Sequence, residues 1–270
     1  MRTLVGSARQ PTLVHVYTAS RTRPLSYDEL VEQALSAPLL GWDFSWLRGR
    51  TSGGSPSWRY TERASALLSA APRLLDLDTG GGEVLASLAP LPRHTVAMEA
   101  WRPNIAIAAE RLRPLNATVL GGTADAIPVS EATFDLVLNR HGALNAAEVA
   151  RVLTPGGRLL TQQVGTRNDL ELNIALGAPL PDPEAWTLAV AVNRLRHYGF
   201  HVLDAREEMI DYVFHDIGAV IFHLRAVPWQ IPDFDHERYE GPLQSLHERI
   251  CSQGEFTVRN HRFLIEAVLL

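Results

Sequence analysis

The segment Leu74-Leu75-Asp76-Leu77-Asp78-Thr79-Gly80-Gly81-Gly82-Glu83 decides the fold of this chain. An apolar run ends in a glycine turn, and a helical stretch begins at Glu83. This order is typical of the first unit of an open parallel sheet. Ligands bind at the carboxyl ends of such strands, where glycines let them approach the backbone closely. The segment therefore predicts a site for a nucleotide-like ligand.

The next apolar run ends in a second carboxylate, in Val96-Ala97-Met98-Glu99. A carboxylate at this place can accept hydrogen bonds from both ribose hydroxyls of a nucleotide. A dinucleotide is disfavoured, because Leu85 stands where the phosphate fingerprint requires a third glycine. The alternative reading of Glu99 is a cap of the following helix.

Short apolar runs alternate with helical stretches from Arg73 onward, which indicates β/α units on a parallel sheet. Ser26 and Glu29 also have the spacing of a capping box, which predicts an earlier helix at about 27–37. The expected strands are 74–77, 95–98, 118–120, 134–138, 159–164, 201–203 and 263–268. The expected later helices are 83–88, 104–112, 146–153 and 183–197.

Two aromatic-rich segments lie outside this pattern. Residues 1–72 are expected to form an N-terminal extension that contributes to the substrate pocket, and residues 210–260 a cap insertion. The core is then 73–209 with 261–270. We expect both segments to cover the carboxyl ends of the strands, because large aromatic side chains there would enclose a pocket. Ordinary packing, or a surface for a partner subunit, is the alternative.

The composition limits the function. The formal net charge is -5, and all 25 basic side chains are arginine, so general nucleic-acid binding is disfavoured and lysine chemistry is excluded. A single cysteine, Cys251, favours a reducing, cytoplasmic setting without disulfides. Residues 1–24 lack the apolar core of a signal peptide, and no apolar run is long enough to span a membrane. We expect no metal site, and the oligomeric state is open, with a homodimer among the options.

Five segments, in order, resemble a known family. Asp76 to Glu83 resembles motif I of the class I S-adenosylmethionine-dependent methyltransferases. The further segments that follow in the family's order are Glu99, Gly122 to Pro128, Phe134 to His141, and Ala150 to Arg158. The resemblance implies an α/β, doubly wound, mainly parallel seven-stranded sheet with an antiparallel last strand. It also implies S-adenosylmethionine as the cofactor.

The same resemblance implies roles for individual residues. Gly80 and Gly82 would face the methionine part of the cofactor, and Glu99 its ribose. Asp125 and the backbone of Ala124 would face the adenine, although Asp125 can also be a simple turn residue. Asn139, Arg140 and His141 would lie beside the methyl group. The implied cofactor-binding set is Asp76, Asp78, Gly80, Gly82, Glu99, Ala124, Asp125 and Asn139.

Asp78 departs from the family pattern, because it stands where motif I has a glycine. A carboxylate there would lie near the carboxylate of the cofactor, which is an unfavourable approach of like charges. Two arrangements would avoid this conflict. Asp78 could face the ammonium or sulfonium of the cofactor, or the pocket could have lost methyl transfer.

The leading functional hypothesis is methyl transfer to a small molecule, of the kind found in secondary metabolism. Positioning supplies most of the catalysis, and a base is needed only where the acceptor carries an acidic proton. His141 is the first candidate base, followed by His215 and then His223. The alternatives are an RNA- or protein-directed enzyme and a methyltransferase-like protein without methyl transfer. An arginine face would favour the RNA enzyme, and Arg48, Arg50, Arg59 and Arg63 could supply it.

Overall fold

The computed structural model describes residues 23, 25–39 and 41–270. The stretch on which the signal-peptide prediction rests lies almost wholly outside these residues. The strands are β1 (Thr51–Gly53), β2 (Arg73–Leu77), β3 (His94–Glu99), β4 (Thr118–Gly121), β5 (Phe134–Arg140), β6 (Leu153–Val164), β7 (Phe200–Phe214) and β8 (Phe256–Leu269). The helices are α1 (Tyr27–Ser36), η1 (Ser45–Leu47), α2 (Tyr60–Leu68), α3 (Glu83–Ser87), α4 (Arg102–Leu112), η2 (Arg113–Leu115), α5 (Ala146–Val152), α6 (Leu170–Leu176), α7 (Leu188–His197), α8 (Ile217–Ala226) and α9 (Glu240–Gln253).

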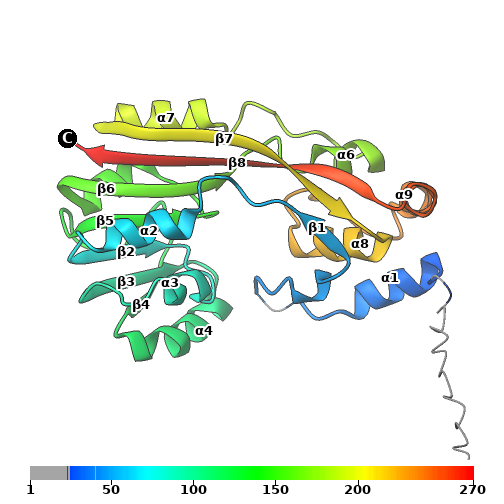
Figure 1. Ribbon diagram of the computed structural model, residues 1–270, viewed down its shortest axis with the longest axis horizontal. Coiled ribbons are helices and arrows are strands. Elements are labelled where there is room, and N and C mark those ends of the chain that lie inside the picture. Colours follow the sequence, from blue (N-terminus) through cyan, green and yellow to red (C-terminus); the bar gives the residue numbers. More distant parts are fainter. Residues whose placement is uncertain (1–22, 24, 40) are drawn as a thin grey trace, which may run out of the picture.

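All eight strands form one sheet in the order β1-β7-β8-β6-β5-β2-β3-β4 (Figure 1). Strands β4, β3, β2, β5 and β6 are parallel, and β8 runs antiparallel to both β6 and β7. The predicted doubly wound sheet with an antiparallel last strand is therefore confirmed. The structure adds an eighth strand, since β1 pairs antiparallel with the end of β7.

Strands β7 and β8 are much longer than predicted. The two strands pair along their full length, from Phe200 opposite Leu269 to Phe214 opposite Phe256. The predicted strands 201–203 and 263–268 were too short, and the predicted insertion 210–260 overlaps both strands at its ends. Charged residues occupy much of β7, which is exposed over many of its positions, so the apolar pattern of a strand is weak there. The helical part of the insertion lies between Phe214 and Phe256.

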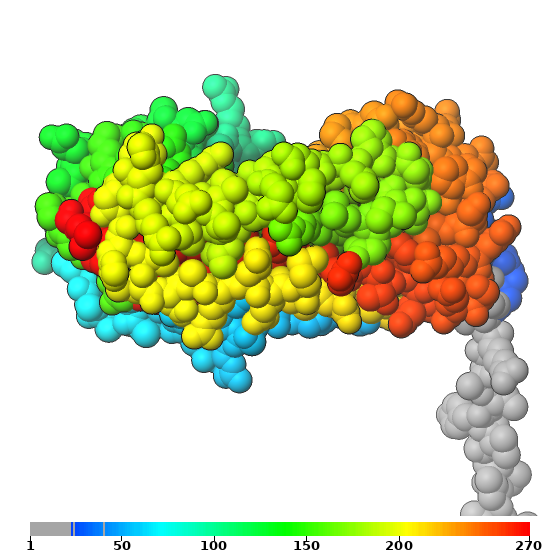
Figure 2. Space-filling model, turned by 90° about the horizontal axis from the view of Figure 1, so that it is seen from above, coloured from blue at the N-terminus to red at the C-terminus, as the bar shows by residue number. Residues whose placement is uncertain are grey.

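Two hydrophobic cores lie along one face of this long sheet, and a third lies on the opposite face. One core packs under α2, α3 and α4 and includes Leu74, Leu138 and Leu264. A second core lies at the far end of β7 and β8, where Phe214 and Phe256 pack with α1, α8 and α9. Helices α5 and α7 cover the opposite face of the first part of the sheet. Figure 2 shows the two ends from above, with the green core surface at one end and the orange α9 region at the other.

The second core extends past the carboxyl ends of the parallel strands. Strand β6 ends at Val164 opposite Arg262, and β8 continues beyond it from Arg262 back to Phe256. Helices α1, α8 and α9 are attached to this extension (Figure 1). Among the helices of the described residues, none is both long and apolar enough to cross a membrane.

Candidate cofactor and acceptor site

The glycine turn after β2 has the backbone that its sequence requires. Gly80 and Gly82 have φ angles of 63° and 79°, in the left-handed region that favours glycine. A Cβ atom on Gly82 would lie 3.0 Å from the Leu112 side chain, so α4 packs directly on the turn. A Cβ atom on Gly80 would lie 3.2 Å from the Trp42 indole. The Trp42 indole therefore packs directly against the backbone of Gly80.

Glu99 fixes the turn to the end of the neighbouring strand. Its carboxylate is buried, and it accepts hydrogen bonds from the Gly80 N–H at 2.7 Å and the Trp101 N–H at 2.8 Å. The second contact lies just before α4, which begins without a side-chain cap, so Glu99 does not cap that helix. Each carboxylate oxygen keeps a lone pair with which it can accept a further hydrogen bond.

The Asp78 side chain makes its hydrogen bond within the protein. Its backbone is left-handed, with a φ of 54°, a conformation that aspartate tolerates better than most residues. Its carboxylate accepts a hydrogen bond from the Ala143 N–H at 2.9 Å. A Cβ atom on Gly142 would lie 2.3 Å from Asp78 Oδ2, so only glycine fits there. Asp78 thus joins the glycine turn to the loop after β5 and leaves the space in front of Gly80 free.

Asp76 is a second perturbed carboxyl group below the turn. Burial raises its pKa to about 7, and the charges of Asp78 and Glu99 act in the same direction. Burial, followed by the charge of Glu99, also raises the pKa of Asp78. Three carboxyl groups therefore lie together at the carboxyl ends of β2 and β3, where a cationic ligand would stabilise their ionised forms.

Two other predicted cofactor residues lie farther along this edge. The Asp125 side chain is exposed and accepts a hydrogen bond from the Asn145 amide at 3.0 Å, while Ala124 is buried. Asn145 in turn caps α5. The placement is compatible with a contact to the adenine, since one carboxylate oxygen of Asp125 has no partner in the described part of the chain.

Asn139 does not face the predicted methyl-transfer centre. It is fully buried, and its oxygen accepts hydrogen bonds from Thr161 at 2.9 Å and Gln163 at 2.5 Å. Its amide donates to the Ala143 carbonyl at 3.3 Å. Asn139 lies on the α5 and α7 face of the sheet, whereas Arg140 lies on the other face. We therefore assign Asn139 to positioning of the loop after β5, which corrects its predicted place beside the methyl group.

His141 has the wrong tautomer for a general base. The Trp58 indole N–H donates to Gln162 Oε1 at 2.7 Å, so the Gln162 amide nitrogen must face His141. That nitrogen lies 2.7 Å from His141 Nε2, which must then accept. Burial, followed by the charges of Arg140 and Arg262, holds the pKa of His141 well below its usual value. The basic nitrogen is therefore occupied, and the ring is a weak base.

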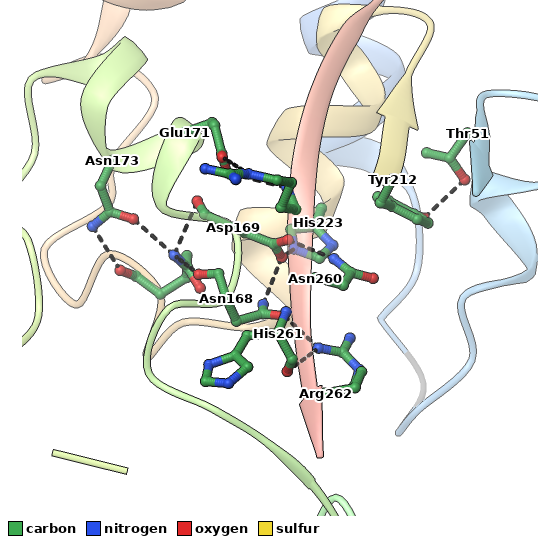
Figure 3. A network of polar contacts seen from close by, with 12 residues as sticks. Thr51, Asn168, Asp169, Glu171, Asn173, Tyr212, His223, Asn260, His261 and Arg262 are labelled. Carbon is green, nitrogen blue, oxygen red and sulfur yellow. Dashed lines mark hydrogen bonds and ion pairs between the residues drawn. The ribbon is translucent and has the colours of Figure 1, made fainter. Parts of the chain in front are cut away.

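His215 and His223 lie in different places. His215 is exposed at the end of β7, and its ring bonds to the Ser52 hydroxyl at 3.0 Å, away from the glycine turn. His223 Nε2 lies 3.2 Å from the buried carboxylate of Asp169 (Figure 3). A carboxylate can only accept, so Nε2 carries a proton, and in the neutral ring Nδ1 then keeps its lone pair. Asp169 also accepts from Asn260 at 2.5 Å, which fixes this pair in place.

A row of polar side chains crosses the sheet on the α2 face. On each strand the last leucine of the core is followed, two residues farther toward the carboxyl ends of the parallel strands, by a polar residue on the same face. On β2 Leu74 is followed by Asp76, on β5 Leu138 by Arg140, on β6 Leu160 by Gln162, and on β8 Leu264 by Arg262. Next to Arg262 on this face of β8 is Asn260, the partner of Asp169. The row therefore separates the two hydrophobic cores.

Exposed tryptophans from two distant segments meet over the glycine turn. Trp42 and Trp229 have exposed fractions of 52% and 61%, and their rings lie edge to face with centroids 5.7 Å apart. Trp101 is 50% exposed, and a Cβ atom on Gly41 would lie 3.7 Å from its ring. The N-terminal segment and the insertion therefore come together beside Gly80, as exposed indoles that a ligand could cover.

These features fit S-adenosylmethionine. Gly80 and Gly82 allow close approach to the backbone, Glu99 keeps lone pairs for hydroxyl groups, and the acidic cluster matches a cationic ligand. The Asp78 side chain does not obstruct this space.

Comparisons with known proteins agree with this geometry. Residues 75–161 match the model of a family described as a methyltransferase domain. A ubiquinone/menaquinone biosynthesis C-methyltransferase of Syntrophotalea carbinolica is 32% identical over 114 residues, which cover 38% of this chain and 48% of that protein. The chain thus spans about half the length of the curated relative that it matches.

Two solved structures share the fold. A candidate methyltransferase from Bacillus halodurans C-125 superposes with a TM-score of 0.56 at 17% identity, over 77% of this chain and 97% of that one. A functionally unknown protein from Deinococcus radiodurans R1 gives a TM-score of 0.55 at 14% identity, over 82% and 91%. Residues 75–161 are therefore similar to a methyltransferase domain, within a fold that the two solved structures share.

The sequence analysis missed three features of the site. Gln162 was not among the predicted site residues, although it sets the tautomer of His141. Arg262 and the Asp169–His223 pair were not recognised as one cluster. The polar residues that interrupt the apolar runs at Gln162 and Asn260–Arg262 were the available signal.

Proposed function

We propose that this protein transfers the methyl group of S-adenosylmethionine to a small molecule in the cytoplasm. The observation that carries the proposal is the glycine turn at Gly80, whose N–H donates to Glu99 and whose backbone packs against the half-exposed Trp42 indole. When bound, the cofactor supplies an electrophilic methyl group on a sulfonium. The chain binds it and holds the acceptor in line with that group.

The acceptor would lie along the polar row between the two hydrophobic cores. There His223, held by Asp169, is the side chain best arranged to take a proton from an acceptor hydroxyl or amine, because Nδ1 is unprotonated and no described residue bonds to it. His223 therefore replaces His141 and His215 as the preferred candidate base.

An RNA-directed enzyme is less well supported. Three of the four arginines that could form a basic face are paired with carboxylates. Arg50 pairs with Asp216, Arg59 with Glu62, and Arg63 with both Asp204 and Glu266. Paired arginines contribute little to the release of counterions from a nucleic acid.

Two measurements test the proposal. Titration calorimetry with S-adenosylmethionine and S-adenosylhomocysteine should show binding of both. Tritium from methyl-labelled cofactor should then enter the low-molecular-mass fraction of a cell extract. Label in the RNA or protein fraction would support the macromolecular alternative. Binding without any transfer would support a methyltransferase-like protein, and absence of binding at millimolar concentration would reject the cofactor assignment.

A further inference from the structure

The polar row contains two arginines without carboxylate partners. The Arg140 side chain has no hydrogen bond or ion pair with any residue in the described part of the chain. Among the described residues, the Arg262 side chain donates to the Asn168 side chain and, at 3.0 Å, to the His261 carbonyl. Burial lowers the pKa of both guanidinium groups, while Tyr60 and Asp76 act in the opposite direction on Arg140. Asp169 raises the pKa of Arg262, and the charge of Arg140 lowers it further. Unpaired cations in such a place cost free energy, so they need a functional explanation.

The two side chains lie on the same face of the sheet. Arg140 is opposite Gln162 in the β5–β6 register, and Arg262 lies two residues from Leu264, the partner of Gln162 on β8. Only β6 lies between their strands, and with the two-residue offset along β8 their backbones are roughly 12 Å apart. Long arginine side chains from both sides can reach one anionic group over that distance.

The nearby acidic groups do not neutralise this pair. Asp76 lies close to Arg140, but its raised pKa leaves it partly protonated near neutrality. Glu208 is opposite Arg262 on β7, yet its two oxygens accept from the N–H and hydroxyl of Ser57. Asp169 is occupied by His223, Asn168 and Asn260.

A neutral donor completes the arrangement. Tyr60, at the start of α2, is only 6% exposed, and its hydroxyl has no hydrogen-bond partner among the described residues. Electrostatic effects of Asp76 and Arg140 reach this hydroxyl, so it lies at the same end of the row. A buried hydroxyl without a partner usually marks a place where a ligand or water binds.

We propose that the methyl acceptor is an anionic small molecule whose oxyanion, a carboxylate or a phosphate, binds between Arg140 and Arg262 with Tyr60 as a further donor. This inference rests on the proposed function and names the substrate class of the same site. Planar guanidinium groups bind both oxyanions through paired N–H donors. The neighbouring His223 then faces the reacting part of the acceptor rather than its anionic group.

The test uses the full chain saturated with S-adenosylhomocysteine, whose binding is measured first. Benzoate, its neutral analogue benzamide, and inorganic phosphate are then titrated by calorimetry. We expect benzoate to bind about tenfold or more tightly than benzamide, the size of one charge-assisted contact. Arg140→Gln and Arg262→Gln should remove that preference, and Arg140→Lys should keep part of it. Arg196→Gln, an equal change of charge on the exposed side of α7, should not alter it.

The phosphate titration identifies the preferred oxyanion. If phosphate displaces benzoate, or if phosphate binds and benzoate does not, the proposal holds and the anionic group of the acceptor is a phosphate. Equal binding of benzoate and benzamide would overturn it, as would no anion binding at millimolar concentration by protein that binds S-adenosylhomocysteine. A loss of S-adenosylhomocysteine binding in Arg140→Gln would also overturn it, since Arg140 would then bind the cofactor's own carboxylate.

Discussion

Replacement of Asp78 by asparagine and by glycine separates its charge from its hydrogen bond. The carboxylate accepts from the Ala143 N–H at 2.9 Å, and loss of such a contact costs about 1.5–3 kcal/mol. Glycine at the left-handed φ of 54° removes backbone strain, which raises the free energy of unfolding by about 1–2 kcal/mol. The greater entropy of the unfolded glycine chain lowers the free energy of unfolding by about 0.5–1 kcal/mol. We therefore expect Asp78→Gly to lower the free energy of unfolding by about 1–2 kcal/mol.

Asp78→Asn should be milder. Asparagine tolerates the same backbone and keeps an oxygen that can accept from Ala143, so we expect a loss of about 1 kcal/mol or less. Asn116→Gly is the matched control. It lies at another left-handed position, with a φ of 57°, and its exposed side chain makes no hydrogen bond within the described structure. This control should be neutral or slightly stabilising.

Urea unfolding of the four proteins and calorimetry with S-adenosylhomocysteine provide the measurements. The order of stability should be wild type, Asp78→Asn, then Asp78→Gly, and asparagine should leave cofactor affinity almost unchanged. If Asp78→Gly is at least as stable as wild type and binds the cofactor more tightly, Asp78 is a misplaced carboxylate and our reasoning is refuted. If asparagine weakens cofactor binding as much as glycine does, the charge itself contacts the cofactor.

Four further predictions concern the same site. Because its pKa is raised, Asp76 binds its proton more tightly in the folded state than in the unfolded state. Its contribution to the free energy of unfolding should therefore be complete below about pH 4 and lost as pH rises through about 7. The urea midpoint of the wild type should follow this pH trend, and that of Asp76→Asn should not. The cationic cofactor should also release a proton from Asp76 on binding, so the affinity ratio of S-adenosylmethionine to S-adenosylhomocysteine should rise between about pH 6 and 8, and a flat ratio would contradict the acidic-cluster model. Trp42→Phe should remove most of the tryptophan fluorescence change on cofactor binding, whereas Trp186→Phe, on the opposite face, should retain it. Once an acceptor is known, His223→Asn should lower kcat by about 10²–10⁴-fold and alter the pH profile of kcat without changing cofactor affinity. The control is His201→Asn, at an exposed position near the start of β7.

Local motifs determined which parts of the site could be predicted. The strand, glycine turn and following helix are consecutive in sequence, and Glu99 ends the next strand, so spacing alone placed them correctly. The direction of Asp78 depends on Gly142 and Ala143, which are distant in the chain. No local sequence pattern predicts that contact. The backbone at Asp78 nevertheless keeps the left-handed conformation that the family's glycine would adopt most easily.

The residues proposed to bind the acceptor are brought together by the register of the strands, which the sequence does not reveal. Asp169 and His223 meet only because α8 packs against the end of β8, and Arg140 and Arg262 share a face only through the pairing of β5, β6 and β8. The extent of β7 was missed for a different reason. Its residues beyond Val202 are largely charged, and pairing with β8 rather than burial makes them a strand.

The continuity of β7 and β8 has a consequence for how ligands enter. Both strands run through the two hydrophobic cores, and their hydrogen-bonded ladder passes the polar row without a break in the pairing from Asp204 to Phe214. The two cores therefore cannot rotate as lobes about a hinge without breaking the backbone pairing between them. The segment from Gly41 to Trp58 is held by strand β1, by Leu47 in the second core and by the buried Trp58, whereas Trp42 near its start contacts Trp229 as an exposed indole. We expect exchange of cofactor and acceptor to depend on the motion of the Trp42 end of this segment across a rigid sheet.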